Sequence, residues 1–117
     1  MTYALLIYRS GLQPLPRAQD QAALAGHRGL QAEASARGAL HAVARLDEPV
    51  TARTVRYRDG AHDIADGPYI EAKEWLVGFY LIDCASADEA AEEARKICTD
   101  SLHTIEVRPV SWRWRPA

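Results

Sequence analysis

The positions of hydrophobic residues along the chain predict four strands. The runs at residues 3–8 and 75–83 are apolar on both alternating faces, which is typical of strands that are covered on both sides. Residues 40–46 and 105–108 alternate between apolar and polar side chains and predict two further strands, the second ending near Pro109. Two of the four strands are therefore expected to need cover on both faces.

Two stretches between these strands have the apolar spacing of helices. The first helix is expected over residues 17–37, followed by Gly38, which accepts the left-handed conformation that commonly ends a helix. His27 falls within the apolar stripe of this helix. The second helix is expected to begin at Ser86, because a Ser followed three residues later by Glu can satisfy free backbone donors, and to end near Cys98.

The Asp-Gly pair at positions 59 and 60 predicts a β-hairpin over residues 53–66, since this dipeptide favours the two-residue turn that joins twisted antiparallel strands. In that register the expected cross-strand partners are Val55 and Ile64, Arg56 and Asp63, and Arg53 and Asp66. The same parity places Asp66 on the face of Val55 and Ile64. An acidic side chain is thus expected to end an apolar face of the hairpin.

The order of these elements predicts the fold class. A β-α-β unit, a hairpin and a second β-α-β unit favour an α+β fold, with a ferredoxin-like sheet, two helices on one face and an added β-hairpin. At 117 residues the chain is expected to form a single domain. Two helices cover only one face of such a sheet, so we expect a second copy to cover the other, in a homodimer paired through the sheet face.

Composition narrows the classes of partner. The chain is 48% hydrophobic and 26% charged, with a formal net charge of −2, as expected for a soluble globular protein that binds neither nucleic acid nor a membrane. A strand-like run directly at the N-terminus makes a cytoplasmic protein the default expectation. Cys84 and Cys98 are expected to be buried structural thiols. The histidines and cysteines lack the spacing of a metal site, and no cofactor is expected.

Several segments of the chain resemble a known family. They are "ALLIYRS", "TVRYRDG", "DGPYIEAKEWLVGFYLID" and "EVRPV", in that order. With them the chain resembles the DGPF subgroup of the YCII-related proteins over nearly its whole length. The resemblance implies a ferredoxin-like subunit that pairs through its sheet into a dimeric α+β barrel, without a settled reaction. It also implies relatives that are joined or adjacent to sigma-factor-like regulators.

The sequence departs from this subgroup at two positions. Tyr69 replaces the Phe of the Asp-Gly-Pro-Phe motif, which adds a hydroxyl that needs a partner if it is buried. His27 corresponds to the His of a proposed His–Asp catalytic pair in similar proteins outside the subgroup, where subgroup members commonly carry an aromatic residue. The resemblance therefore implies a combination of the two patterns.

The candidate chemistry is acid/base catalysis. His27 titrates near neutral pH, and the Gly67-Pro68 corner holds Asp66 rigidly, so these two residues are the candidate catalytic pair. Tyr69, Glu71, Lys73 and Glu74 are the candidate ligand-binding residues. The alternatives are structural: a turn beside a solvated Glu–Lys pair, and a histidine whose hydrogen bonds are satisfied within the core.

Two functions from different classes follow. The first is a small-molecule-binding dimeric α+β barrel protein that performs cofactor-free acid/base chemistry, such as proton abstraction or elimination, on a small organic ligand. The second is a non-enzymatic regulatory or interaction module linked to transcription, acting through the sheet edge or the C-terminal tail with Trp112 and Trp114. A third possibility is that the acidic motif only stabilises the dimer.

Overall fold

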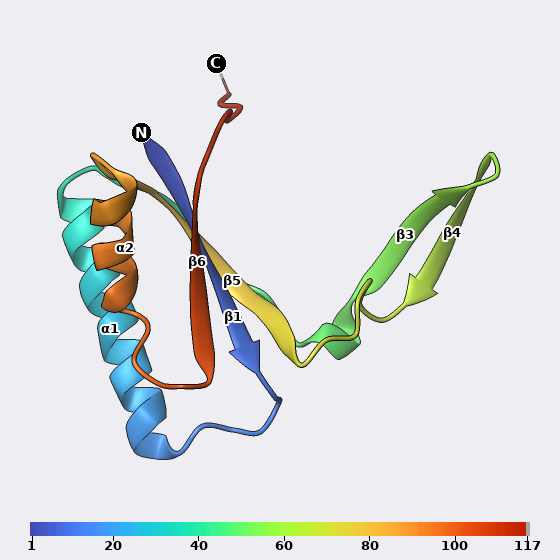
Figure 1. The fold of residues 1–117 in the computed structure, drawn as a ribbon, viewed down its shortest axis with the longest axis horizontal. Coiled ribbons are helices and arrows are strands. Elements are labelled where there is room, and N and C mark those ends of the chain that lie inside the picture. Colours follow the sequence, from blue (N-terminus) through green and yellow to red (C-terminus); the bar gives the residue numbers. More distant parts are fainter. Residues whose placement is uncertain (117) are drawn as a thin grey trace.

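A computed structural model describes residues 1–116 and shows a four-stranded sheet, two helices on one of its faces, and a separate two-stranded hairpin (Figure 1). The elements are β1 (Thr2–Ser10), α1 (Arg17–Ala36), β2 (Leu40–Arg45), the 3₁₀ turn η1 (Pro49–Thr51), β3 (Arg53–Arg58), β4 (Ala61–Asp66), β5 (Glu74–Asp83), α2 (Ala87–Arg95) and β6 (His103–Pro109). The predicted α+β class is confirmed, and the order of elements is compatible with a ferredoxin-like arrangement.

The larger sheet, here called the main sheet, has the strand order β2-β5-β1-β6, and each neighbouring pair is antiparallel. The central strands are β1 and β5, which are the two runs that are apolar on both faces. Leu5 of β1 lies opposite Tyr80 of β5 on one side and Val107 of β6 on the other. The most apolar strands thus occupy the middle of the sheet, where neighbours satisfy their backbone groups on both edges.

The core lies between the main sheet and the helices. It contains the alternate residues of β1 and β5 that point toward the helices, together with apolar residues of α1 and α2: Tyr3, Leu5, Ile7, Tyr80, Ile82, Leu30, Ala34, Ala90 and Ala94. The opposite face of the sheet, here called the open face, carries two rows of residues that are only partly buried. These rows are Ala4, Leu81 and Ala42, and Leu6, Phe79 and Ala44. The described chain therefore covers β1 and β5 on one side only.

The two helices begin and end for local reasons. The Ser86 hydroxyl accepts a hydrogen bond of 3.1 Å from the Glu89 amide, and the Glu89 carboxylate accepts one of 3.0 Å from the Ala85 amide, which confirms the predicted cap. Gly38 has a φ of 67° directly after α1, as predicted. Gly26 of α1 lies against the end of α2, where an added Cβ would stand 2.3 Å from the carbonyl oxygen of Lys96. The helices therefore approach each other closely at this glycine.

The two cysteines differ in their surroundings. Cys84 is buried, as predicted. The prediction for Cys98 is wrong, because α2 ends at Arg95 and the chain turns away before Cys98, leaving that residue exposed. Its sulfur lies 3.6 Å from the carbonyl oxygen of His103.

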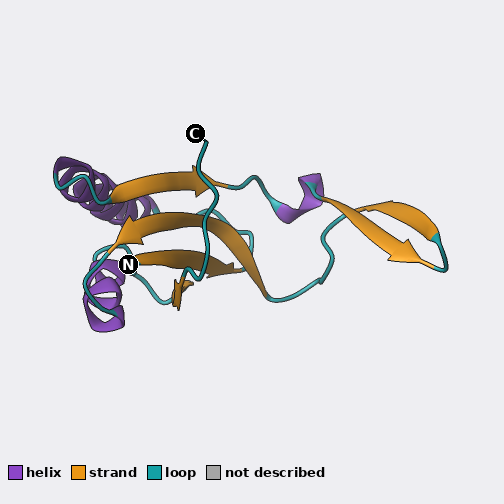
Figure 2. Cartoon of the chain, turned by 90° about the horizontal axis from the view of Figure 1, so that it is seen from above, coloured by secondary structure: helices purple, strands orange, loops and turns teal. Residues whose placement is uncertain are grey.

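The hairpin, here called the arm, comprises residues 53–66 and projects away from the main sheet (Figures 1 and 2). Its predicted register is confirmed, including the pairs of Val55 with Ile64 and of Arg53 with Asp66. The chain leaves for the arm and returns from it at neighbouring points of the main sheet, since the Leu46 amide donates a hydrogen bond of 2.7 Å to the Val77 carbonyl.

Candidate functional site

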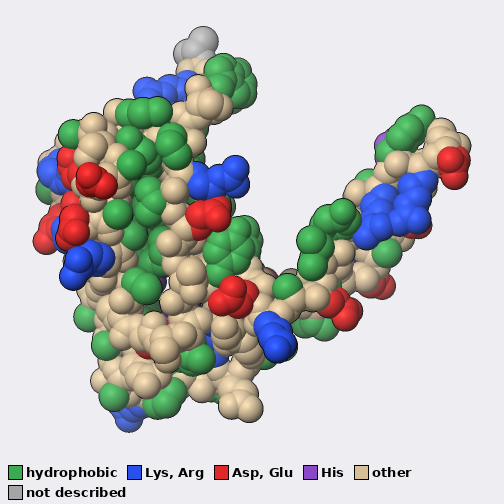
Figure 3. Space-filling view, viewed as in Figure 1, with side chains coloured by type: hydrophobic (Ala, Val, Ile, Leu, Met, Phe, Trp, Pro, Cys, Tyr) green, Lys and Arg blue, Asp and Glu red, His purple; other side chains and the backbone are tan. Residues whose placement is uncertain are grey.

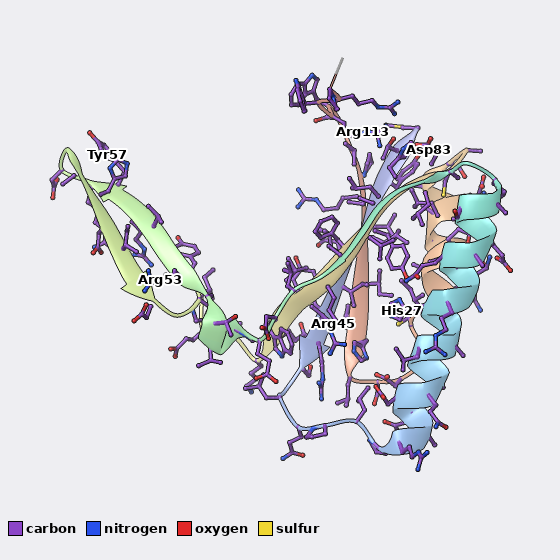
Figure 4. All side chains as sticks on the ribbon, turned by 180° about the vertical axis from the view of Figure 1, so that it is seen from behind. His27, Arg45, Arg53, Tyr57, Asp83 and Arg113 are labelled. Carbon is purple, nitrogen blue, oxygen red and sulfur yellow. The ribbon has the colours of Figure 1, made fainter. Side chains whose placement is uncertain are left out.

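His27 lies in the middle of α1 on the side that faces the main sheet (Figure 4). Its Nδ1 atom is 2.7 Å from the hydroxyl oxygen of Tyr80 on β5, and the two rings stack with a centroid separation of 5.7 Å and an angle of 11°. Gln31, one helical turn further along α1, donates a hydrogen bond of 3.2 Å from Nε2 to the same oxygen. The helix and the sheet are therefore joined by a polar cluster of three side chains.

The Tyr80 hydroxyl can serve either neutral form of the His27 ring. Tyr80 is 1% exposed, and burial raises the pKa of its phenol even though the hydrogen bond from Gln31 acts in the opposite direction. The hydroxyl therefore stays protonated near neutral pH. It can donate to Nδ1 or accept from Nδ1–H, so neutral His27 can carry its proton on either nitrogen.

The environment of His27 favours the neutral imidazole. Burial lowers the pKa of His27, and the positive charges of His103 and Arg45 lower it further. Figure 4 shows Arg45, at the end of β2, at about the same height along the sheet as His27. A half-buried, neutral histidine that is held by the Tyr80 hydroxyl has the protonation state that a general base requires.

A second histidine in this region is paired with a carboxylate. The Nδ1 atom of His103 lies 2.9 Å from the Oδ1 atom of Asp100, which also accepts hydrogen bonds from the amides of Leu102 and His103. Burial alone would raise the pKa of the Asp100 carboxyl, but the hydrogen bonds from His103 and from the Leu102 amide outweigh it and lower the pKa. The sequence analysis did not predict this pair, although Asp100 stands only three residues before His103, where β6 begins.

A third histidine forms a cross-strand pair at one end of the main sheet. The Nε2 atom of His41 lies 2.7 Å from the Oδ2 atom of Asp83, and the Thr2 hydroxyl donates a hydrogen bond of 2.7 Å to Oδ1. The hydrogen bonds from Thr2 and His41 lower the pKa of the Asp83 carboxyl. The sequence alone does not predict this pair, because it does not show that β2 and β5 are neighbours.

Asp66 does not lie near His27 within one chain. It ends β4 on the arm, where its Oδ1 atom pairs with Nε of Arg53 at 3.3 Å and its side chain is 88% exposed. The sequence analysis predicted Asp66 and His27 as a catalytic pair, but β3 and β4 form a sheet of their own, apart from the sheet that α1 covers. Figure 4 shows Arg53 on the arm and His27 on the opposite side of the molecule. A contact between Asp66 and His27 would therefore need a second subunit.

The other candidate residues follow the chain from the arm back to the main sheet. The guanidinium group of Arg56 lies 4.7 Å from the centroid of the Tyr69 ring, and Tyr69 is exposed. Glu71 and Lys73 are exposed, and the described ion pairs of residues 1–116 do not join them. Glu74, at the start of β5, accepts a hydrogen bond of 3.4 Å from the Ser10 hydroxyl. These residues are therefore spread along the segment that joins the arm to β5, and they do not form one cluster.

Two hollows lie elsewhere on the surface. One of about 220 Å³ is on the arm and is lined by Thr54, Arg56, Arg58, Asp63, Ala65, Asp66 and Pro68. The other, of about 550 Å³, is a shallow groove between the helices and is lined by Glu33, Ala36, Arg37, Glu93 and Lys96. In the groove the Lys96 amine pairs with the carboxylates of Glu33 and Glu93 at 2.8 and 2.9 Å. The charged side chains that line the groove therefore neutralise one another. Only the hollow on the arm contains a residue that the sequence singled out, Asp66.

The described part of the chain contains neither a cluster of metal-ligating side chains nor a helix that could span a membrane. Over residues 1–116, no three His, Cys, Asp or Glu side chains are placed so that they could hold a metal ion. Within the same residues, no helix has both the length and the apolar character needed to cross a bilayer.

The fold and this geometry define a small α+β protein with a histidine held between a helix and the open-sided sheet. The model of the YCII-related domain matches residues 1–115, and the chain belongs to the YCII-related family. A protein of Rhizobium meliloti (strain 1021), named uncharacterized protein R00369, is 38% identical over 115 residues, which is 95% of this chain and 93% of that protein. The predicted family is confirmed, whereas the DGPF subgroup stays a prediction. The relative's name carries no activity that could be compared.

Proposed function

We propose that the protein is a homodimer that binds a small organic molecule beside His27 and performs cofactor-free acid/base chemistry on it, by proton abstraction or elimination. The observation that carries this proposal is the state of His27. Its ring is half-buried, is held by the Tyr80 hydroxyl at 2.7 Å, and has a lowered pKa because of burial and nearby positive charge.

In the proposed reaction His27 accepts a proton from the bound molecule through Nε2. The Tyr80 hydroxyl then accepts a hydrogen bond from Nδ1–H, which orients the ring and stabilises the imidazolium that forms. Because Gln31 also bonds the Tyr80 oxygen, the hydroxyl keeps its position during the transfer. The positive charge of Arg45 disfavours the imidazolium, so the proton is readily returned to the product or to water.

The homodimer is supported by the open face of the main sheet. Six apolar residues form the two rows across β1, β5 and β2, and the described chain leaves all six partly exposed. Apolar surface of this extent on a sheet is favourably buried against an identical surface through a two-fold axis. In this assembly the candidate residues Asp66, Tyr69, Glu71, Lys73 and Glu74 act on the ligand from the motif that leads out of the arm, with Asp66 exchanging protons with His27 of the other subunit.

Native mass spectrometry of the protein as purified from cells tests the binding part of the proposal. The expected result is a dimer with a small-molecule adduct whose mass identifies the ligand. The adduct should be weakened in His27→Gln and in Asp66→Asn but kept in Glu92→Gln, which removes an exposed carboxylate of α2. A monomer would contradict the homodimer, and unchanged adducts in both site variants would contradict the site.

The chemistry is tested on the identified ligand in D₂O. Proton abstraction by His27 exchanges a C–H hydrogen of the ligand for deuterium, which NMR detects even when no net product forms. We expect exchange with the wild-type protein and at least about a hundredfold slower exchange with His27→Gln, in line with the usual contribution of a general base. Equal rates for the two proteins would show that His27 is not the base.

A second candidate function is a regulatory interaction module that acts through the C-terminal tail. It is favoured by Trp112 and Trp114, which are 75% and 69% exposed, since exposed tryptophans are common anchors of protein interfaces. A chain ending at Val110 should then lose a partner that the full chain captures in a pull-down. Identical sets of partners for the two chains would exclude this function for the tail.

A further inference from the structure

The arm has two chemically different faces. Its register places Val55, Tyr57 and Ile64 on one face, where they are 61%, 68% and 63% exposed. Residues Arg56, Arg58 and Asp63 lie on the other face and line the small hollow. Figure 3 shows hydrophobic side chains along the edge of the arm that is turned back toward the body, with basic side chains beside them.

Nothing in the described chain supports the apolar face. Strands β3 and β4 pair only with each other. Figure 2 shows them beyond the end of the main sheet, joined to it by loops and the short turn η1. An isolated two-stranded hairpin is marginally stable in water and needs further packing for lasting order. The base of the arm is nevertheless fixed, because the Gly67 amide bonds the Ala52 carbonyl at 2.8 Å and the Thr54 hydroxyl bonds the Gly67 carbonyl at 2.8 Å. The base of the arm is thus held in place, whereas its apolar face packs against no other strand or helix of the described chain.

The charge of the arm argues against a nucleic acid as its occupant. Residues 53–66 contain three arginines and three aspartates, so the arm carries no net charge at neutral pH with its histidine neutral. The exposed side chains of its apolar face instead match a partner that offers apolar surface. The same chain offers apolar surface outside the two rows of the open face, where Leu46 beyond β2 and Val50 of η1 are 40% and 79% exposed.

We infer that the apolar face of the arm docks against a second copy of this chain, and that two subunits exchange their arms across a two-fold axis. Each arm lies along the partner's body next to the paired sheets, so Val55, Tyr57 and Ile64 become buried. The inference rests on the proposed homodimer and adds to it the element that clasps the two subunits. It also explains how Asp66 and Tyr69, at the base of the arm, come close to a site in the partner.

A pair of matched variants tests this docking. The variant Val55→Glu with Ile64→Lys replaces two facing apolar residues by a cross-strand ion pair, which keeps the hairpin but removes its apolar face. The control, Arg58→Glu with Ala61→Lys, introduces the same two residues as a facing pair on the opposite face. Dimer dissociation constants come from light scattering over a dilution series, and hydrogen–deuterium exchange of the amides in residues 53–66 is followed at high and low protein concentration.

The expected result is that the first variant raises the dimer dissociation constant at least about tenfold while the control leaves it within about twofold. Arm amides of the wild-type protein should also exchange more slowly in the dimer than in the diluted monomer. If the first variant dimerises like the wild type and the arm amides exchange equally fast at both concentrations, the arm does not dock, although the homodimer stands. A wild-type protein that stays monomeric at all concentrations overturns both the arm exchange and the proposed homodimer.

Discussion

His27 of α1 and Tyr80 of β5 are joined by a contact of 2.7 Å between Nδ1 and the phenolic oxygen, and their rings are stacked at an angle of 11°. The contact connects the first helix to a central strand across the apolar core. Since Tyr80 is 1% exposed, its hydroxyl needs a partner there, and the two side chains of α1 supply it. The polar cluster is therefore part of the packing as well as of the proposed site.

The pKa of His27 should respond to the charge of Arg45. Burial and the charges of His103 and Arg45 place this pKa below 6.5, and Arg45→Gln removes one positive charge, so the pKa should rise toward its ordinary value. The measurement is an NMR titration of the imidazole resonances. Arg28→Gln, an exposed change on the same helix, is the control and should leave the titration unchanged. A His27 pKa that is the same in the Arg45 variant as in the wild type would contradict the electrostatic account.

The free energy of unfolding should decrease as the pH is lowered through a window set by the pKa of His27. Its pKa is lower in the folded chain than the ordinary 6.5 expected when unfolded, so between these values the unfolded state binds more protons. The free energy of unfolding therefore decreases as the pH falls from about 7 through the folded pKa, and it levels off below that pKa. Urea unfolding at several pH values should show a smaller decrease for His27→Gln than for the wild type. A larger decrease in the variant would reverse the sign of the linkage.

Two glycines of α1 should respond oppositely to alanine. Gly29 has nothing within 4 Å of an added Cβ, so Gly29→Ala should raise the free energy of unfolding by about 0.5 to 1 kcal/mol through helix propensity. Gly26→Ala would place a Cβ 2.3 Å from the Lys96 carbonyl oxygen and push the helices apart, at a net cost of about 1 to 3 kcal/mol. Urea unfolding of both variants measures the difference. Equal effects would mean that α1 and α2 do not approach each other as described.

Replacing Asp66 should leave the fold intact. The ion pair of Asp66 with Arg53 is 88% and 74% exposed on its two sides, and such pairs contribute little to stability. Asp66→Asn should therefore change the free energy of unfolding by less than about 0.5 kcal/mol. Ser86→Ala, which removes the cap of α2, should lower it by about 1 kcal/mol and serves as a positive control. A large effect of Asp66→Asn would point to a structural role of the acidic motif.

Features that depend on neighbours in sequence could be predicted, and features that depend on the packing of distant segments could not. The hairpin register and the cap at Ser86 follow from turn and capping chemistry within a few residues. The placement of the arm does not, because no local pattern states whether a hairpin continues a sheet or leaves it. That is why the sequence suggested a pair of Asp66 with His27, although the two residues lie on separate parts of the chain's structure.

The candidate site divides in the same way. His27 was found from its position within an apolar helical stripe, where a histidine must have a partner. Its partner Tyr80 was not found, since the pairing of β1 with β5 and the position of α1 above them decide which hydroxyl meets the ring. The pair of His41 with Asp83 was missed for the same reason. The two residues are neighbours only because β2 lies beside β5.

The chain enters and leaves the arm at adjacent positions of the main sheet, where Leu46 bonds Val77. Removing or lengthening the segment between them would leave the four strands and both helices with their present neighbours. In engineering terms the arm is a separate module. Its hairpin and loops can be redesigned without altering the main sheet or the contact between His27 and Tyr80.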